Sequence, residues 1–291
     1  MKKASEASMT KRHRGIAVFS DIHGNLEALN VVMRKAKELN VDAIYSLGDV
    51  VGYGPEPVEC LRMAADFGLN IIGNHEDIAF FKRRASGDKI LSHAAEKSLD
   101  WTKKQVEGSN TRKYMENFKE SVLRNGILYV HGKPTEPITG YIHTDENPFS
   151  IVTEMNKMDE RRARICFCGH THTPSFFRYD KELESMLCQV IRDQRTNEHL
   201  HEPFDSHTPF EQEVMLKKDE TCIINAGSVG QPRDGDPRAC FLVYDGKAGS
   251  YEKVTFYRVP YDIEATQSKI IKSGLPGKIA EIIAARLKSG R

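Results

Sequence analysis

The stretch SDIHGN at residues 20–25 follows the apolar run IAVF at residues 16–19 and precedes a segment with helical spacing of apolar residues. The apolar run predicts a buried strand over residues 15–20, and the spacing after it predicts a helix over residues 24–40. Asp21 and His23 lie two residues apart at the end of this strand, so their side chains point to the same side. Because α/β proteins keep their active sites at the carboxyl ends of strands, this pair is a candidate for a functional site.

The same layout occurs four more times along the chain. In each case an apolar, strand-like run is followed by Asp, Asn or His beside a glycine, which lets the backbone turn sharply and approach a ligand closely. These clusters are Gly48-Asp49, Gly73-Asn74-His75-Glu76, His131-Gly132 and Gly169-His170-Thr171-His172. We expect the strand ends to converge on one edge, so that the polar side chains line one cavity. The candidate ligands there are Asp21, His23, Asp49, Asn74, His131, His170 and His172.

These candidates offer carboxylate oxygen, amide oxygen and imidazole nitrogen, without a thiolate. Such a set suits Mn, Fe or Zn and contains too much nitrogen for Ca or Mg alone. The ligands are too many for one tetrahedral ion, but they suit two ions about 3.5–4 Å apart that share one carboxylate. Each motif alone is common in surface turns, so the prediction of two divalent metal ions rests on the joint occurrence of the motifs at successive strand ends.

The order of the predicted elements indicates an α/β fold with mixed sheets. Strands over residues 15–20, 41–47 and 70–72 alternate with helices over 24–40 and 58–67, which predicts a parallel arrangement. An Asn-Gly turn at residues 125–126 predicts a hairpin, so antiparallel pairing must also occur. Later strands are expected over residues 164–168, 175–179, 186–191, 221–225, 239–244 and 253–259, and closing helices over 263–272 and 276–288.

Composition narrows the class of protein. The chain has 291 residues and a formal net charge of +1, so no bulk attraction to nucleic acid or to an anionic membrane is expected. The six cysteines are scattered and lie mostly in apolar runs, which indicates buried, reduced thiols. The sequence lacks an apolar run of about 18 residues, and its polar, basic start lacks the apolar core of a secretory signal. We therefore expect a cytoplasmic protein without a membrane span.

Patterning along the chain also predicts the domain organisation. Residues 1–14 are predicted to be a disordered basic start, and residues 15–291 a single domain. Two segments, near residues 133–160 and 192–218, are predicted to be surface insertions. The second of these is polar and lacks clear periodicity, so we expect it to lie outside the sheets.

The clusters together resemble the signature of the calcineurin-like metallophosphoesterase superfamily. That signature runs Asp-x-His, Gly-Asp, Gly-Asn-His-Asp/Glu, His and Gly-His-x-His, and it spans roughly residues 15–244 here. The segments at residues 48–55, 227–233 and 261–276 look like a bacterial branch of predicted phosphodiesterases. The resemblance implies a four-layer αββα sandwich, in which two mixed β-sheets are flanked by helices.

The resemblance also implies a division of the ligands between two ions. One ion would take Asp21, His23, Asp49 and His172, and the other Asp49, Asn74, His131 and His170, with Asp49 bridging. His75 would bind neither ion. It would be the catalytic residue that faces the substrate and protonates or stabilises the leaving oxygen.

One departure from the family pattern concerns phosphate binding. In protein phosphatases of this superfamily, an Asp three residues after the bridging Asp orients the catalytic histidine, and an Arg that follows it binds phosphate. Gly52 and Tyr53 stand at those positions here. Substrate phosphate is therefore predicted to meet Arg233 or Arg238, each of which also suits a surface ion pair. The carboxylate partner of His75 stays open, with the adjacent Glu76 as one candidate.

The resemblance implies a metal-dependent phosphoesterase that uses a hydroxide bridging two metal ions. A phosphodiesterase acting on a small-molecule or nucleotide phosphoester is favoured. The alternatives are a phosphatase of phosphoproteins or dinucleoside polyphosphates, and a non-catalytic metal-binding scaffold. Retention of His75 and of all the candidate ligands favours an enzyme over a scaffold.

Overall fold

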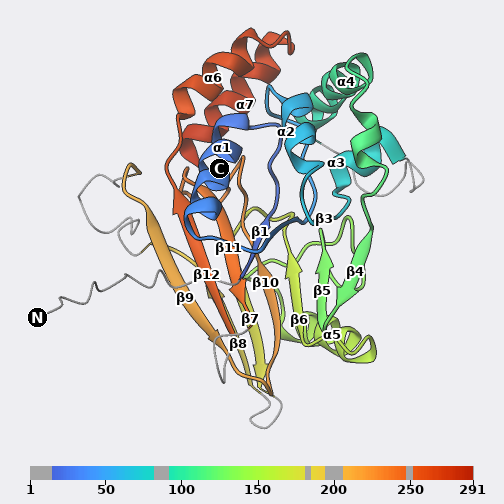
Figure 1. Cartoon of the computed structure of the whole chain (residues 1–291), viewed down its shortest axis with the longest axis vertical. Helices are drawn as coiled ribbons and strands as arrows, with labels where there is room; N and C mark the ends of the chain where they lie inside the picture. The colour runs from blue at the N-terminus through green and yellow to red at the C-terminus, as the bar shows by residue number, and fades with distance from the viewer. Residues whose placement is uncertain (1–14, 82–91, 181–184, 194–205, 247–251, 291) are drawn as a thin grey trace, which may run out of the picture.

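Two mixed β-sheets pack face to face and carry helices on their outer surfaces (Figure 1). The computed structural model describes residues 15–81, 92–180, 185–193, 206–246 and 252–290. This arrangement confirms the predicted αββα sandwich. The predicted disorder of residues 1–14 lies outside the described residues.

The first sheet has the strand order β3-β2-β1-β11-β12-β9. Its parallel half consists of β1 (Ile16–Phe19), β2 (Ala43–Ser46) and β3 (Leu69–Asn70). Its antiparallel half consists of β11 (Ala239–Asp245), β12 (Glu252–Val259) and β9 (Phe210–Leu216). The parallel half arises because helical crossovers join its strands, as the sequence pattern predicts.

The second sheet has the strand order β4-β5-β6-β10-β7-β8. It consists of β4 (Ser121–Arg124), β5 (Ile127–Val130), β6 (Ile165–Cys168), β7 (Ser175–Asp180), β8 (Ser185–Val190) and β10 (Thr221–Asn225). β5, β6 and β10 are parallel, and the other pairings are antiparallel. The β4–β5 turn places Asn125 and Gly126 at φ of 52° and 75°, which is the left-handed pair that an Asn-Gly hairpin turn requires.

Helices cover the outer faces of both sheets (Figure 1). α1 (Leu26–Glu38) and α2 (Pro57–Ala64) pack on the first sheet, and α5 (Pro148–Glu160) packs on the second. The remaining described helical segments are α3 (Asn74–Glu76), the π-helical η1 (Asp77–Phe81), α4 (His93–Gly108), the 3-10 helix η2 (Arg112–Met115), α6 (Ile263–Lys272) and α7 (Gly277–Ser289). Within the described residues, none of these helices is long and apolar enough to cross a membrane.

The core between the sheets is aromatic and fully buried. Tyr129 and Phe167 from the second sheet lie in one cluster with Val18 and Phe256 from the first. Close packing of this kind holds neighbouring strand ends at fixed distances. The sandwich therefore provides a rigid base for the loops that leave the strands at one edge.

The prediction that residues 192–218 form a surface insertion outside the sheets is wrong for the second half of this segment. Residues 210–216 form β9, which pairs along its whole length with β12 at the edge of the first sheet. Val214 and Leu216 are buried between the sheets, whereas Glu211 and Glu213 are exposed. Residues 194–205 lie outside the described residues. The first predicted insertion, residues 133–160, is a loop followed by α5, and its loop reaches the functional site described below.

A buried ion network anchors the loop between β10 and β11. Arg258 of β12 pairs with Asp234 of this loop and lies 3.7 Å from Asp236, and its side chain is 1% exposed. Arg238 donates to Asp236 and Asp193. The loop has no regular secondary structure, and these ion pairs hold it together with hydrogen bonds such as those from the Val229 and Gly230 amides to the Ser20 and Asp21 carbonyls.

Removing one partner from this network is expected to destabilise the fold strongly. Arg258→Met leaves the buried carboxylate of Asp234 uncompensated, which should lower the free energy of unfolding by about 3–5 kcal/mol. Lys253→Met on the same strand is the matched control, because Lys253 pairs with Glu213, whose side chain is 58% exposed. Its loss should cost at most about 1 kcal/mol. Urea unfolding of both variants measures the difference, and equal losses would contradict the role given to Arg258.

Candidate metal centre

Five strand ends of the two sheets bring the candidate ligands together, as the sequence predicts. Asp21 follows β1, Asp49 follows β2, Asn74 follows β3, His131 follows β5 and His170 follows β6. The backbone is left-handed at Asp21, His23, Asp49, His170 and His172, with φ between 50° and 67°. Such conformations are uncommon for residues other than glycine and collect at functional sites, because surrounding structure must hold them in place.

One group of ligand atoms is formed by Asp21, His23 and His172. Their ligating atoms lie within 4.8 Å of one another. His172 Nε2 lies 3.2 Å from Asp21 Oδ1 and 3.1 Å from His23 Nε2. All three side chains are buried.

A second group is formed by Asp49, His131 and His170, with Asn74 beside it. His131 Nε2 lies 3.4 Å from Asp49 Oδ2, 3.0 Å from His170 Nδ1 and 3.1 Å from Asn74 Oδ1. Asp49 Oδ2 is also 3.7 Å from His23 Nε2, which belongs to the first group. The carboxylate of Asp49 therefore lies between the two groups.

Backbone carbonyls fix how three of the histidine rings are turned. The Nδ1 atoms of His23, His131 and His172 lie 3.1, 2.9 and 2.5 Å from carbonyl oxygens of Val51, Leu47 and Gln231. A carbonyl only accepts, so each Nδ1 must carry the hydrogen in the neutral ring. Each Nε2 then presents its lone pair to the centre, which is the arrangement that metal-binding histidines require.

The two carboxylates are held in a similar way. Asp21 Oδ2 accepts from Ser20 Oγ at 2.6 Å and from the His170 amide at 3.0 Å. Asp49 Oδ1 accepts from the His75 amide at 2.9 Å. In both residues the protein holds one oxygen and leaves the other facing the histidine nitrogens. Gly169 is required for this packing, because a Cβ there would lie 1.9 Å from Ser20 Oγ.

These residues fit a divalent metal. The buried Asp21 Oδ1 has no hydrogen-bond partner, and the Nε2 atoms of His23 and His172 face each other at 3.1 Å. Burial alone raises the pKa of Asp49, but the surrounding histidines, His131 first, bring it well below its usual range. Burial alone lowers the pKa of His131, but Asp49 raises it to about 9. The centre thus holds an ionised carboxylate that favours positive charge beside it, and a metal ion would supply that charge in place of the proton on His131.

Comparison with known proteins identifies the family. Residues 15–188 match the family model of the calcineurin-like phosphoesterase superfamily domain. The chain belongs to this superfamily. A metallophosphoesterase from Sphaerobacter thermophilus has 32% identical sequence and a TM-score of 0.73, over 96% of this chain and 99% of that one.

Two further relatives cover nearly the whole chain. An uncharacterized protein of Methanocaldococcus jannaschii is 32% identical over 95% of this chain and 98% of its own length. A hypothetical protein from Pyrococcus horikoshii OT3 is 20% identical, covers 95% of this chain and 98% of that one, and shares the fold with a TM-score of 0.67. Together with the clustered ligands, the family supports a metal-dependent phosphoesterase.

His75 lies beside the candidate ligands of this metallophosphoesterase. Its Nε2 is 3.9 Å from Asp49 Oδ2, and burial lowers its pKa to about 4. With His23 and Asp49 it forms a third group of close ligand atoms, so geometry alone does not separate it from the ligands. Its Nδ1 is buried without a hydrogen-bond partner, against the backbone of Gly52. A Cβ at position 52 would lie 2.0 Å from that nitrogen.

Glu76 was a candidate for the carboxylate partner of His75, but its side chain points to backbone amides. Its carboxylate accepts from the backbone amides of Asp49, Val51 and Gly73 at 2.9, 3.0 and 2.9 Å. These bonds tie the loop after β2 to the loop after β3. Burial raises the pKa of Glu76 to about 7. Glu76 therefore positions two ligand-bearing loops, and within the described residues its carboxylate bonds to these backbone amides and not to the ring of His75.

The two arginines predicted to bind substrate have different surroundings. Arg233 is half-buried, donates to Gln231 Oε1 at 3.0 Å and lies 5.8 Å above the ring of Tyr53. Burial is the largest cause of the lowered pKa of His172, and the positive charge of Arg233 lowers that pKa further. Arg238 is 1% exposed, and its guanidinium is bound to Asp236 and to other buried acceptors. This burial contradicts the predicted substrate role of Arg238.

Sequence reasoning missed Tyr141. Its ring stacks on His170 with centroids 3.8 Å apart, and it also stacks with the ring of His143, with centroids 5.4 Å apart. The only sequence signal was its place in the loop that follows His131, within the predicted surface insertion.

Loosening one carboxylate should weaken metal binding without removing a ligand. Ser20→Ala deletes the 2.6 Å hydrogen bond to Asp21, and loss of such a supporting contact costs about 10–100-fold in metal affinity. Ser175→Ala is the control, because the buried Ser175 hydroxyl makes no hydrogen bond. Calorimetric titration with Mn²⁺ should show a lower metal affinity for Ser20→Ala and an unchanged affinity for Ser175→Ala. An unchanged affinity would show that this bond does not orient Asp21.

Proposed function

We propose that this protein is a phosphodiesterase that works with two divalent metal ions, Mn, Fe or Zn, bridged by Asp49. The observation that carries the proposal is the position of Asp49 Oδ2. It lies 3.7 Å from His23 Nε2 in one ligand group and 3.4 Å from His131 Nε2 in the other. One ion would be held by Asp21, His23, Asp49 and His172. The other would be held by Asp49, Asn74, His131 and His170.

Bound divalent ions supply Lewis-acid charge for the phosphoryl oxygens and lower the pKa of water, which yields a nucleophile at neutral pH. The residues of this chain supply the positions. The carbonyl bonds to Nδ1 of His23, His131 and His172 keep the imidazoles aimed at the centre without reorganisation during the reaction. The buried surroundings strengthen each of these electrostatic contacts.

His75 is proposed to act on the leaving oxygen. Its Nε2 lies 3.9 Å from Asp49 Oδ2, on the side of the ligand groups, whereas its Nδ1 is packed against Gly52. The low pKa of His75 means that the ring is neutral near pH 7 in the absence of substrate. The neutral ring can donate a hydrogen bond from Nε2 to the leaving oxygen. If the substrate's negative charge raises the pKa of the ring so that it takes up a proton, the imidazolium can transfer its Nε2 proton to the leaving oxygen and return to the neutral form.

A diester is favoured over a monoester by the charge around the centre. A phosphate monoester brings two negative charges, whereas a diester brings one. Arg233 is a cation near the centre, because its charge helps to lower the pKa of His75 and His172, and Tyr53 stands where the family phosphatases carry an arginine. A substrate screen of monoesters and diesters with several metals tests this preference. Faster hydrolysis of monoesters with every metal would contradict it.

Loss of the shared carboxylate should remove both ions. Asp49→Ala is expected to reduce bound metal to well below one ion per chain after Mn²⁺ reconstitution, and to abolish nearly all hydrolysis. Asp66→Ala is the control, because Asp66 is an exposed aspartate after α2. Metal analysis of dialysed protein gives the readout. Full metal occupancy in Asp49→Ala would show that the bridging assignment is wrong.

Loss of the His75 ring should leave metal binding intact and slow catalysis. His75→Ala is expected to lower kcat by about 10²–10⁴-fold on an alkyl diester, because the alkoxide leaving group needs a donor. The loss should be smaller on an aryl diester, because nitrophenolate leaves without a proton. Kinetics on both substrates at equal metal occupancy test this.

Three other results are informative. An equal loss on both diesters would restrict His75 to charge stabilisation. Retention of full activity would remove it from the mechanism. Loss of metal would instead identify His75 as a ligand of the third group.

A further inference from the structure

The rings of His170, Tyr141 and His143 form a stack that leads outward from the metal centre. The Tyr141 ring lies 3.8 Å from that of His170, at an interplanar angle of 30°. The His143 ring lies 5.4 Å from that of Tyr141, at an angle of 6°. A parallel pair at this distance is offset, so part of each ring face is not covered by the other.

Exposure increases along the stack. His170 is buried, Tyr141 is half-buried and His143 is exposed. A tyrosine alone would suffice to cover His170. The second, parallel ring of His143 keeps an aromatic surface in contact with solvent beside the centre.

The loop that carries the stack is held in place. Thr135 donates to Glu154 of α5 through its amide and its hydroxyl, at 2.8 and 2.7 Å. Lys133 pairs with the same carboxylate at 3.1 Å. Ile142, between the two stacked residues, is 3% exposed and packs against α5. These contacts fix the aromatic surface before any ligand arrives, which lowers the cost of binding to it.

The charge of Arg233 also acts on Tyr141. Burial raises the pKa of Tyr141, and the charge of Arg233 opposes that rise, which places the two residues near each other. Arg233 also lies over the ring of Tyr53. A ligand at the metal centre would therefore have the aromatic stack and the cation of Arg233 nearby.

We propose that Tyr141 and His143 form a binding surface for a planar aromatic group, such as a nucleobase, on one ester arm of the substrate. This inference rests on the proposed function, since it describes the group attached to the phosphate at the metal centre. The planar group would stack on the exposed part of the two rings, and the phosphate of the same substrate would bind at the metal centre. Tyr141 and His143 would then determine specificity without taking part in bond cleavage.

Binding measurements test the surface directly. Thymidine 5′-phosphate and tetrahydrofurfuryl phosphate share the phosphate and the five-membered ring, and only the first has a base. The Mn²⁺-loaded protein should bind the first about five- to tenfold more tightly, as measured by calorimetry. The ratio of the two affinities cancels any effect of a variant on metal binding. Equal affinities in the wild type would overturn the inference.

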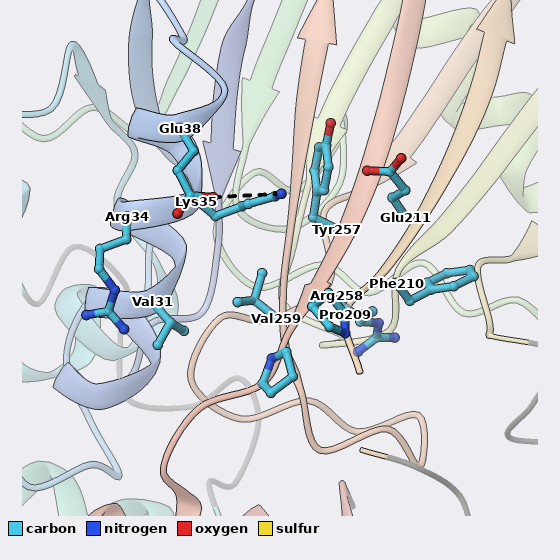
Figure 2. A pocket seen from close by; sticks show the side chains of 11 residues that line it. Val31, Arg34, Lys35, Glu38, Pro209, Phe210, Glu211, Tyr257, Arg258 and Val259 are labelled. Atoms are coloured by element: carbon cyan, nitrogen blue, oxygen red, sulfur yellow. Dashed lines mark ion pairs between the residues drawn. The ribbon is translucent and has the colours of Figure 1, made fainter. Parts of the chain in front are cut away.

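Variants assign the preference to the stack. Tyr141→Leu should bring the affinity ratio close to one, whereas Tyr141→Phe, which keeps the ring, should preserve it. His143→Ala should lower the ratio in part. The matched control is Tyr257→Leu, because Tyr257 stacks on Phe241 at 5.1 Å and lines a separate pocket of about 430 Å³ between α1, β9 and β12 (Figure 2).

The control should keep the wild-type ratio. An equal ratio in Tyr141→Leu and in the wild type would refute the assignment to Tyr141.

The p-nitrophenyl esters of the same two phosphates separate this inference from the proposed function. Their common leaving group makes the chemical step comparable, so a preference should appear as a lower KM for the thymidine ester. Turnover of both esters with equal KM would overturn the aromatic surface alone. Tighter binding of thymidine 5′-phosphate without turnover of either ester would support the surface and refute the phosphodiesterase.

Discussion

The site depends on how one buried carboxylate is held. Asp49 Oδ1 accepts from the His75 amide, and the Asp49 amide donates to Glu76, so neighbouring loops fix the residue at both ends. Its Oδ2 is left among the imidazoles of two ligand groups. A carboxylate buried among lone pairs is costly unless positive charge is nearby. The folded chain thus prepares a place for cations, and the cost of preparing it is met by the packing of the two sheets.

The backbone conformation at the site adds to that cost. Several ligand residues adopt left-handed φ angles, and these angles persist because the strands on each side are locked in a sheet. Glycines allow the close approaches that remain. Gly169 makes room for Ser20 and Asp21, and Gly52 makes room for the ring of His75. Gly52 stands where the family phosphatases carry the aspartate that orients the catalytic histidine. Here the residue affects the position of His75 by leaving room for its ring, and not by providing a charged partner.

Much of the fold and most of the ligand set could be predicted from sequence, because the signals were local. An apolar strand followed by a polar residue and a glycine marks a strand end, and each ligand lay in such a pattern. The edge strand β9 was missed because its alternation of buried Val214 and Leu216 with exposed glutamates is short and follows a polar segment. Its pairing with β12 is a long-range contact that periodicity alone does not specify.

The roles of Arg238, Glu76 and Tyr141 could not be predicted for a similar reason. Arg238 looked available because a guanidinium near a Gly/Pro loop is usually exposed, yet Asp193 and Asp236 bury it. Glu76 lies beside His75 in sequence, but the short helix α3 turns its carboxylate toward backbone amides of other loops. The ring of Tyr141 stacks on that of His170, which follows a different strand. Each outcome depends on which segments meet in space.

The most direct test of the central claim is the electron paramagnetic resonance spectrum of the Mn²⁺-reconstituted protein, recorded with metal analysis of the same sample. A carboxylate shared by two ions about 3.5–4 Å apart couples their electron spins. We expect two Mn²⁺ per chain and a spectrum of an exchange-coupled pair. One Mn²⁺ per chain, or two that give only the six-line signal of isolated ions, would contradict a centre built on Asp49 as a bridge.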